Sequence, residues 1–152
     1  MTEDTSPDEV EVLIDTIREY DETHTNSSEI EKLTNIGKTA VPRLTRALED
    51  KDGYIRRVSA IILGNIGAGN PENWDPGAGF EGNAIEKLIR HLDDIDYEVI
   101  MASAEALGKI GNKCAVKHLT WLVKDERPFV SPGKEVKQAA ANALAMLGHE
   151  VE

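Results

Sequence analysis

The stretch Asp52-Gly-Tyr-Ile-Arg-Arg-Val-Ser-Ala-Ile-Ile-Leu-Gly-Asn-Ile-Gly67 decides the fold of this chain. A second version of it begins 44 residues later and runs from Asp96 to Gly111. In both versions apolar and small residues recur at helical spacing, and a glycine follows the last of them. Self-similarity at a period of about 20 to 50 residues is typical of repeat proteins, whose units bury their apolar faces against one another. The sequence therefore predicts a stack of similar helical units.

Each of the two stretches is the second helix of a predicted helical pair. A first helix precedes each of them, and its apolar register recurs along the whole chain. The first-helix positions are Val10, Leu13 and Ile17, then Val41, Leu44 and Leu48, then Ile85, Leu88 and Leu92, and then Val116, Leu119 and Val123. The pattern predicts four units of two antiparallel helices, of which the first is shortened and acts as a cap.

The units define one predicted domain over residues 7–148, preceded by a disordered acidic segment, residues 1–6. Their boundaries are near 7–37, 38–67, 83–111 and 112–148. Loops rich in proline and glycine are predicted at 68–82, between the second and third units, and at 127–133, inside the fourth unit.

Local signals mark the ends of the helices. Ser6, Ser28 and Asn83 each stand three residues before a glutamate, which predicts helix starts near residues 7, 29 and 84. Four glycines follow the periodic runs and suit the left-handed residue that ends a helix. These glycines are Gly37, Gly67, Gly111 and Gly148.

Composition agrees with an all-α fold. The chain has 152 residues, enough for one domain, and its hydrophobic share is 40% although aromatic residues make up only 5%. A core built from Leu, Ile, Val and Ala favours helices. We expect a right-handed α–α superhelix, or solenoid, of about four helical hairpins.

Charge and cysteine content exclude several classes of protein. The net charge of −11 disfavours binding to nucleic acid or to an anionic membrane surface. The single cysteine, Cys114, cannot form an internal disulfide, and the N-terminus lacks the features of a signal peptide. No run is long enough to span a membrane, and we expect a cytoplasmic protein.

The second-helix pattern Asp-x-x-Val/Ile-Arg-x-x-(Ala/Ser)-Ala-x-x-Leu-Gly-x-Ile-Gly resembles the HEAT-like repeats of the phycobilisome-lyase (PBS-lyase) type, over about residues 9–148. The resemblance implies the superhelical fold. In such repeats the Asp caps its helix and the Arg pairs with an acid of a neighbouring unit. Ile100 stands at the Arg position of the third unit, where we expect it to interrupt that ladder and to contact apolar neighbours. Small residues such as Gly64 and Gly108 are expected to let neighbouring helices approach closely.

No catalytic or metal-binding constellation is visible in the sequence. Deoxyhypusine hydroxylase, a HEAT-like enzyme, binds iron through His-Glu pairs, and the matching positions here read Arg57-Val58, Met101-Ala102 and Gln138-Ala139. His149-Glu150 has no second copy, and the remaining histidines, at 24, 91 and 118, are not in equivalent positions. The acidic run 93–98 lacks the glycine of a calcium loop, and its acids are expected to cap the next helix. Together with an assignment of Cys114 as structural, this predicts a protein that is not an enzyme and needs no metal or cofactor.

A binding surface is the remaining candidate. The second helices expose equivalent positions that should line the concave side, and some of these positions are apolar. Such apolar residues either form a recognition patch or are covered as the curve tightens, and the sequence leaves both readings open. The aromatic residues of loop 68–82 are either anchors for a partner or pins for the loop. The predicted partner-binding residues are Tyr54, Arg57, Ile61, Trp74, Phe80, Met101, Glu105, Gln138 and Asn142.

Together these features predict a non-catalytic protein–protein interaction module, either a scaffold or adaptor or a regulatory subunit. Its partner, a protein, would bind the concave face. The alternative is a chromophore-handling protein or subunit related to bilin lyases, which the family resemblance implies. Trp121 occupies an outward position that is polar in other units, so it either seals the C-terminal flank or makes a dimer contact. We expect a monomer or a weak dimer through a terminal repeat.

Overall fold

The structure is a computed structural model that describes residues 7–20, 26–69, 79–124 and 133–149. For residues 7, 8, 69 and 79–83 it describes the backbone alone. The predicted N-terminal segment 1–6 and most of the predicted loop 127–133 lie outside the described residues. None of the described helices is long and apolar enough to cross a membrane.

The fold is all-α, as the composition predicts, and the described residues contain no β-strand. Short 3-10 turns, at Gly37–Ala40, His91–Asp93 and Lys113–Ala115, lead into or out of the helices. The helices are α1 (Pro7–Tyr20), α2 (Ser27–Ile36), α3 (Val41–Ala47), α4 (Gly53–Gly69), α5 (Gly79–Arg90), α6 (Tyr97–Ile110), α7 (Val116–Val123) and α8 (Lys134–Met146).

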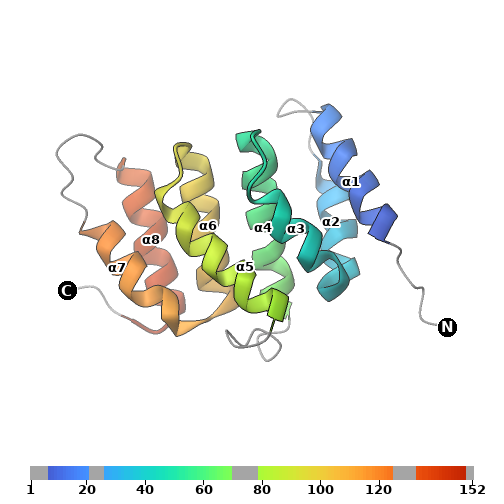
Figure 1. Cartoon of the computed structure of the whole chain (residues 1–152). Helices are drawn as coiled ribbons and strands as arrows, with labels where there is room; N and C mark the ends of the chain where they lie inside the picture. Colours follow the sequence, from blue (N-terminus) through green and yellow to red (C-terminus); the bar gives the residue numbers. More distant parts are fainter. Residues whose placement is uncertain (1–6, 21–25, 70–78, 125–132, 150–152) are drawn as a thin grey trace.

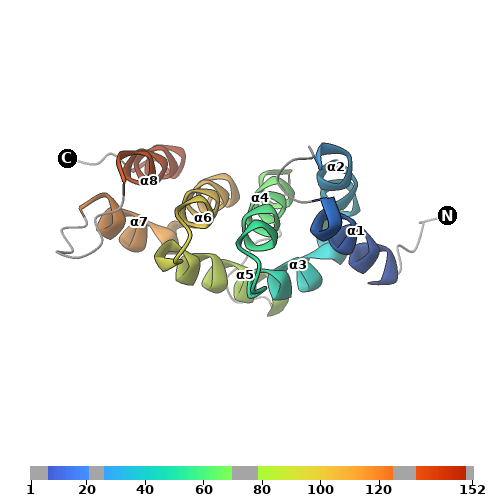
Figure 2. The same ribbon diagram turned by 90° about the horizontal axis from the view of Figure 1, so that it is seen from above.

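The helices form two rows (Figures 1 and 2). Helices α1, α3, α5 and α7 follow one row, and α2, α4, α6 and α8 follow the other. Within the second row α4 packs on α2 and α6, and α6 packs on α8. Seen from above, both rows bend into a shallow arc with the second row on its inner side (Figure 2).

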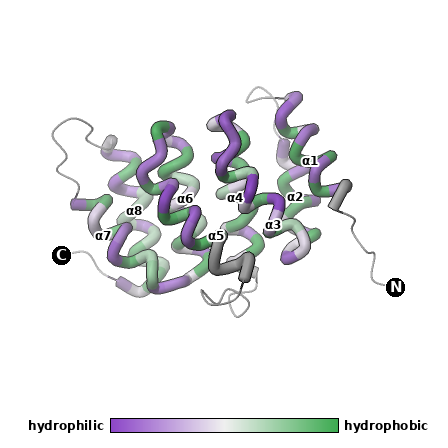
Figure 3. Tube along the Cα trace, viewed as in Figure 1, coloured by the Kyte–Doolittle hydropathy of each residue, from purple (hydrophilic) through white to green (hydrophobic). Residues whose placement is uncertain are grey.

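Aliphatic side chains fill the space between the two rows. Apolar and polar residues alternate along the helices at helical period (Figure 3), as required when one side of a helix is covered and the other meets water. Most of the predicted core positions are confirmed, because residues at the repeating register are almost inaccessible, but Val116 and Val123 of α7 are only partly buried. Examples are Leu44, Leu88 and Leu119 in the first row and Ile55, Leu63 and Leu107 in the second.

Three of the four predicted helix-ending glycines have a positive φ: Gly37 at 72°, Gly111 at 81° and Gly148 at 75°. The prediction for Gly67 is wrong, because α4 continues to Gly69. Glycine adopts helical φ as readily as left-handed φ, and no residue from 67 to 69 stops a helix. Pro71 comes two residues later, and proline disfavours helical backbone at the residue before it.

One predicted capping residue and one predicted helix start are also corrected. Helix α2 begins at Ser27, so Ser28 lies inside the helix. Asn26 occupies the capping position, but its side chain makes no capping hydrogen bond. Helix α5 begins at Gly79, which places Asn83 within the helix rather than at its start. Residues 68–69 and 79–82 of the predicted loop are therefore helical. The start of α1 at Pro7 agrees with the prediction.

Candidate interaction surface

Small residues set the spacing of the inner row. A Cβ atom added to Gly64 of α4 would lie 2.7 Å from the Cα of Ala106 on α6, and one added to Gly108 would lie 2.9 Å from the Cα of Ala143 on α8. Neither position has room for a side chain. The prediction that these glycines allow close helix packing is confirmed, and it places equivalent positions of α4, α6 and α8 side by side.

We define the inner face as the positions of α4, α6 and α8 that point away from the first row of helices, toward the concave side of the arc. Two contacts join α4 to α6 across it. Nη1 of Arg57 donates to Oε2 of Glu98 at 3.1 Å, and Nζ of Lys109 donates to Oδ1 of Asn65 at 3.0 Å. The inner face comprises Tyr54, Arg57, Ile61 and Asn65, then Glu98, Met101, Glu105 and Lys109, and then Glu135, Gln138, Asn142 and Met146.

The apolar residues of the inner face are only partly accessible. Tyr54, Ile61 and Met101 are half-buried and pack against the core. Met146 differs, since it is 51% exposed and its Sδ lies close to Gly108 of the neighbouring helix. The apolar surface available to a partner is therefore smaller over α4 and α6 than at the end of α8.

Tyr54 also joins two helices. Its hydroxyl accepts a hydrogen bond from Nδ2 of Asn26 at 2.8 Å, which connects the start of α4 to the start of α2. Asn26 is 4% exposed, so its amide depends on protein partners. Sequence reasoning missed this residue, although an Asn immediately before a helix was visible.

The polar residues of the inner face remain open to solvent. Glu105, Gln138 and Asn142 are exposed, and Arg57 is partly exposed. Within α8, Nε2 of Gln138 donates to Oδ1 of Asn142 at 2.9 Å. Glu98 and Lys109 share this face and were not among the predicted binding residues, although the helical register alone identifies them.

The sequence singles out three further aromatic residues: Trp74, Phe80 and Trp121. Trp74 and the side chain of Phe80 lie outside the described residues. Trp121 on α7 is 54% exposed, so it is not enclosed at the C-terminal flank.

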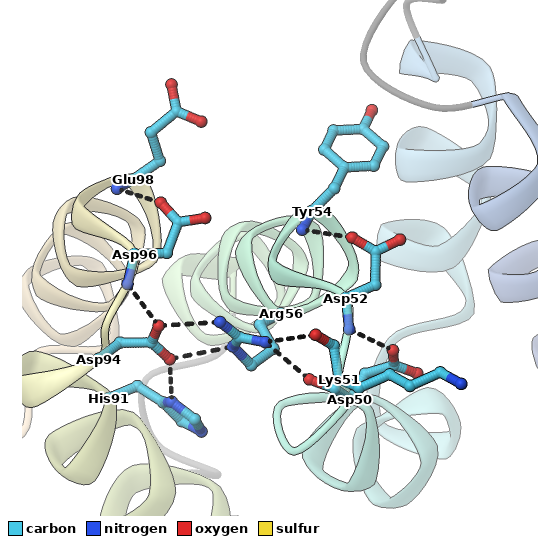
Figure 4. A network of polar contacts seen from close by, with 9 residues as sticks. All are labelled: Asp50, Lys51, Asp52, Tyr54, Arg56, His91, Asp94, Asp96 and Glu98. Carbon is cyan, nitrogen blue, oxygen red and sulfur yellow. Dashed lines mark hydrogen bonds and ion pairs between the residues drawn. The ribbon is translucent and has the colours of Figure 1, made fainter.

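A network of charged groups lies where α3 meets α4 and where α5 meets α6 (Figure 4). Arg56 of α4 donates from Nε and Nη2 to the Asp94 carboxylate, each at 3.0 Å. Its Nη1 donates to the carbonyl oxygens of Asp50 and Lys51. One guanidinium therefore joins the turns that precede α4 and α6.

The aspartates of this network organise the two turns in the same way. Asp52 accepts from the backbone N–H of Tyr54, and Asp96 accepts from that of Glu98. Asp50 and Asp94 each accept from the N–H two residues later. The expectation that the aspartate caps the second helix is confirmed for Asp52 and Asp96, whereas Asp50 and Asp94 hold the turns before those helices.

Hydrogen bonding holds two of these carboxylates in the charged form. Burial raises the pKa of Asp94, but hydrogen bonds from Arg56, the Asp96 N–H and His91 outweigh it, so the pKa lies below its usual value. The Arg18 guanidinium, which donates to both oxygens of Asp50, lowers the pKa of that group. These ion pairs connect α1 to the turn before α4, and α4 to the turn before α6.

Ile100 occupies in α6 the register position that Arg56 has in α4. It is 3% exposed and belongs to the apolar core, so the expectation of apolar neighbours is confirmed.

Cys114 and possible metal ligands are two further candidates for chemistry in the described ranges. Cys114 is exposed, and partial burial of its thiol raises its pKa. Within the described ranges, no three His, Cys, Asp or Glu side chains are placed to hold a metal ion.

No protein-family model matches the chain, and no curated protein does. Among solved structures, the chain is similar to the crystal structure of an engineered protein, a target of the Northeast Structural Genomics Consortium. The TM-score is 0.61 at 25% sequence identity. The match covers 93% of this chain and 63% of the engineered protein.

Proposed function

We propose that this chain is a non-catalytic protein-interaction module that binds a protein partner on its inner face, as a scaffold, an adaptor or a regulatory subunit. One observation carries the proposal. Close contact at Gly64–Ala106 and Gly108–Ala143 aligns α4, α6 and α8, so equivalent side chains from three helices line one surface. Repeat proteins use such extended surfaces for binding.

The composition of the inner face supports a protein partner. Exposed Glu105, Gln138 and Asn142 lie on the same face as the exposed Met146 and the half-buried Met101. Protein interfaces combine apolar contacts with a polar rim in this manner. In this proposal Tyr54 and Ile61 contribute their accessible edges, and Trp74 and Phe80 stay predicted partner-binding residues whose side chains lie outside the described part of the chain.

The proposal includes membership of the HEAT-like repeats of the PBS-lyase type and a right-handed superhelical path. The capping Asp52 and Asp96 support it, as does the pairing of Arg56 with an acid of the next unit. It further includes a cytoplasmic location and function without a cofactor, nucleic acid or bilin. The net charge of −11 supports the exclusion of nucleic acid.

Paired surface variants test this function. The partner is first isolated by affinity capture and purified, and its affinity is then measured for the wild type and for Glu105→Arg combined with Asn142→Arg. We expect at least about tenfold weaker binding, because both positions are exposed on the inner face. The control combines Arg46→Glu with Glu86→Arg, at exposed positions of the other row, and should bind as the wild type does. Equal loss in both double variants would place the partner elsewhere, and a shifted absorbance band on adding free bilin would favour chromophore handling.

A further inference from the structure

Consecutive units of this chain carry charges of alternating sign. Residues 1–37 contain eleven acidic and two basic residues, and residues 70–111 contain nine acidic and three basic residues. Between them, residues 38–69 contain six basic and three acidic residues, and residues 112–152 contain six basic and five acidic residues. Each boundary between units therefore joins a mainly acidic unit to a more basic one.

Ion pairs join the first unit to the second and the second unit to the third. Arg43 of the second unit binds Glu11 of the first at 2.6 Å. Arg56 of the second unit binds Asp94 of the third at 3.0 Å, with side chains 12% and 5% exposed. Opposite charge on neighbouring units is thus part of how the units stack.

The α7–α8 end presents a basic surface at which no described residue packs further. In α4 and α6 the next helix covers Gly64 and Gly108, whereas Ala145, at the same register position of α8, is exposed. Glu135 is the one acidic residue among the described residues from 112 to 149. The described basic residues of this unit are Lys113, Lys117, Lys124, Lys134 and Lys137.

The α1–α2 end presents the opposite charge. Glu9, Asp15, Glu19 and Glu31 are all exposed on these two helices. Val12 is 62% exposed. It has the register position of Arg43 in the second unit, whose side chain binds Glu11 of the preceding unit. The first unit therefore carries several exposed acids, and its Val12 is an accessible apolar side chain at the position that faces a preceding unit.

The register of the repeat brings one pair of charges together when two copies are aligned end to end. Lys137 of α8 stands where Arg56 stands in α4, and Glu19 of α1 stands where Asp94 stands before α6. Arg56 and Asp94 form the most buried ion pair described between units. Stacking the α1–α2 end of a second copy on α8 would repeat this pairing with Lys137 and Glu19.

We propose that this chain associates with copies of itself head to tail, the α7–α8 end of one copy packing on the α1–α2 end of the next, with Lys137 facing Glu19 of the neighbouring copy. The Cβ of Ala145 prevents the close approach made at Gly64, so the contact is looser than those within the chain and depends on charge. The two surfaces differ, so the contact is heterologous, and assembly continues past the dimer or closes into a ring.

Analytical ultracentrifugation of the full chain tests the proposal. The average mass at low salt should rise from monomer past dimer as the protein concentration goes from micromolar to millimolar. Added salt should reverse the association, since the contact relies on exposed charges. A mass that stays monomeric throughout, or that stops at a dimer with no larger ring or chain, overturns the proposal.

Charge reversal identifies the surfaces. Lys137→Glu places an acid opposite Glu19 of the neighbouring copy, and Glu19→Lys places a base opposite Lys137, so each variant alone should associate at least about tenfold more weakly. An equimolar mixture should associate as the wild type does, because each modified end then meets its opposite. The control is Arg46→Glu, because Arg46 is exposed and the substitution changes the net charge by the same amount as Lys137→Glu. This variant should associate as the wild type does. Circular dichroism checks that each variant is folded, and single variants that associate normally, or a mixture that fails to regain association, contradict the proposal.

Discussion

Arg56 and Asp94 are joined by two hydrogen bonds of 3.0 Å, with Asp94 5% and Arg56 12% exposed in their side chains. The pair links α4 to the turn that precedes α6, and the same guanidinium holds the carbonyl oxygens of residues 50 and 51. A single side chain therefore connects two units and closes one turn.

Arg56→Ala should destabilise the protein strongly. The change leaves the Asp94 carboxylate in a covered site without its main partner, and we expect the free energy of unfolding to fall by about 3 kcal/mol. Urea denaturation followed by circular dichroism measures it.

The matched control for this change is Arg90→Ala. Arg90 pairs with Glu86, but their side chains are 66% and 65% exposed, so we expect a loss below about 0.5 kcal/mol. Similar losses in both variants would show that burial does not distinguish the two ion pairs.

Stability should fall in acid because of Asp50 and Asp94. Both have a pKa below the usual value in the folded protein, so the folded state binds fewer protons than the unfolded chain. Their contribution is complete above the unfolded pKa of about 3.9 and is lost as the pH falls through the lower folded values. Urea denaturation at successive pH values should show a shallower acid slope for Asp50→Asn than for the wild type. If the two proteins lose stability with the same slope in acid, Asp50 does not contribute to the pH dependence.

Tyr54→Phe separates a structural role of Tyr54 from a binding role. The change removes the hydroxyl that accepts from Asn26, whose amide is then covered and unpaired, and we expect a loss of about 1–2 kcal/mol in thermal or urea unfolding. Tyr97→Phe is the control, because Tyr97 is 47% exposed. If Tyr54→Phe keeps full stability, the hydrogen bond contributes little and Tyr54 is available to a partner.

Gly64→Ala should destabilise the contact between α4 and α6. Its Cβ would lie 2.7 Å from the Cα of Ala106, which belongs to the backbone and cannot rotate away. Despite the better helix propensity of alanine, we expect a net loss of about 1–3 kcal/mol. Ala145→Gln, at the equivalent exposed position of α8, should change the free energy of unfolding by less than about 0.5 kcal/mol. A stabilised Gly64→Ala protein would mean that the two helices can separate at little cost.

The helical class and the core were predictable because aliphatic residues recur with one register from Val10 to Leu144. Helix ends were less predictable where the residue at the expected end is also compatible with another structural role. Glycine suits both a helix and its end, so Gly67 did not stop α4. Asn26 stands at a capping position but directs its amide to Tyr54, and no local pattern specifies a contact 28 residues away.

The candidate surface was predictable in position but not in accessibility. Helical spacing places Tyr54, Ile61 and Met101 on the inner face, yet their burial depends on how closely α2, α4 and α6 approach. That distance follows from contacts between units, such as Gly64 with Ala106, which the sequence of a single helix does not specify.

The Gly64–Ala106 contact separates what holds this protein together from what it displays. Because backbone atoms and a methyl group set the distance between α4 and α6, the exposed residues beside them are free to vary without altering that distance. A library randomised at Glu105, Gln138 and Asn142 would keep one backbone and present many different surfaces. The chain is thus a suitable starting point for selecting new binding proteins.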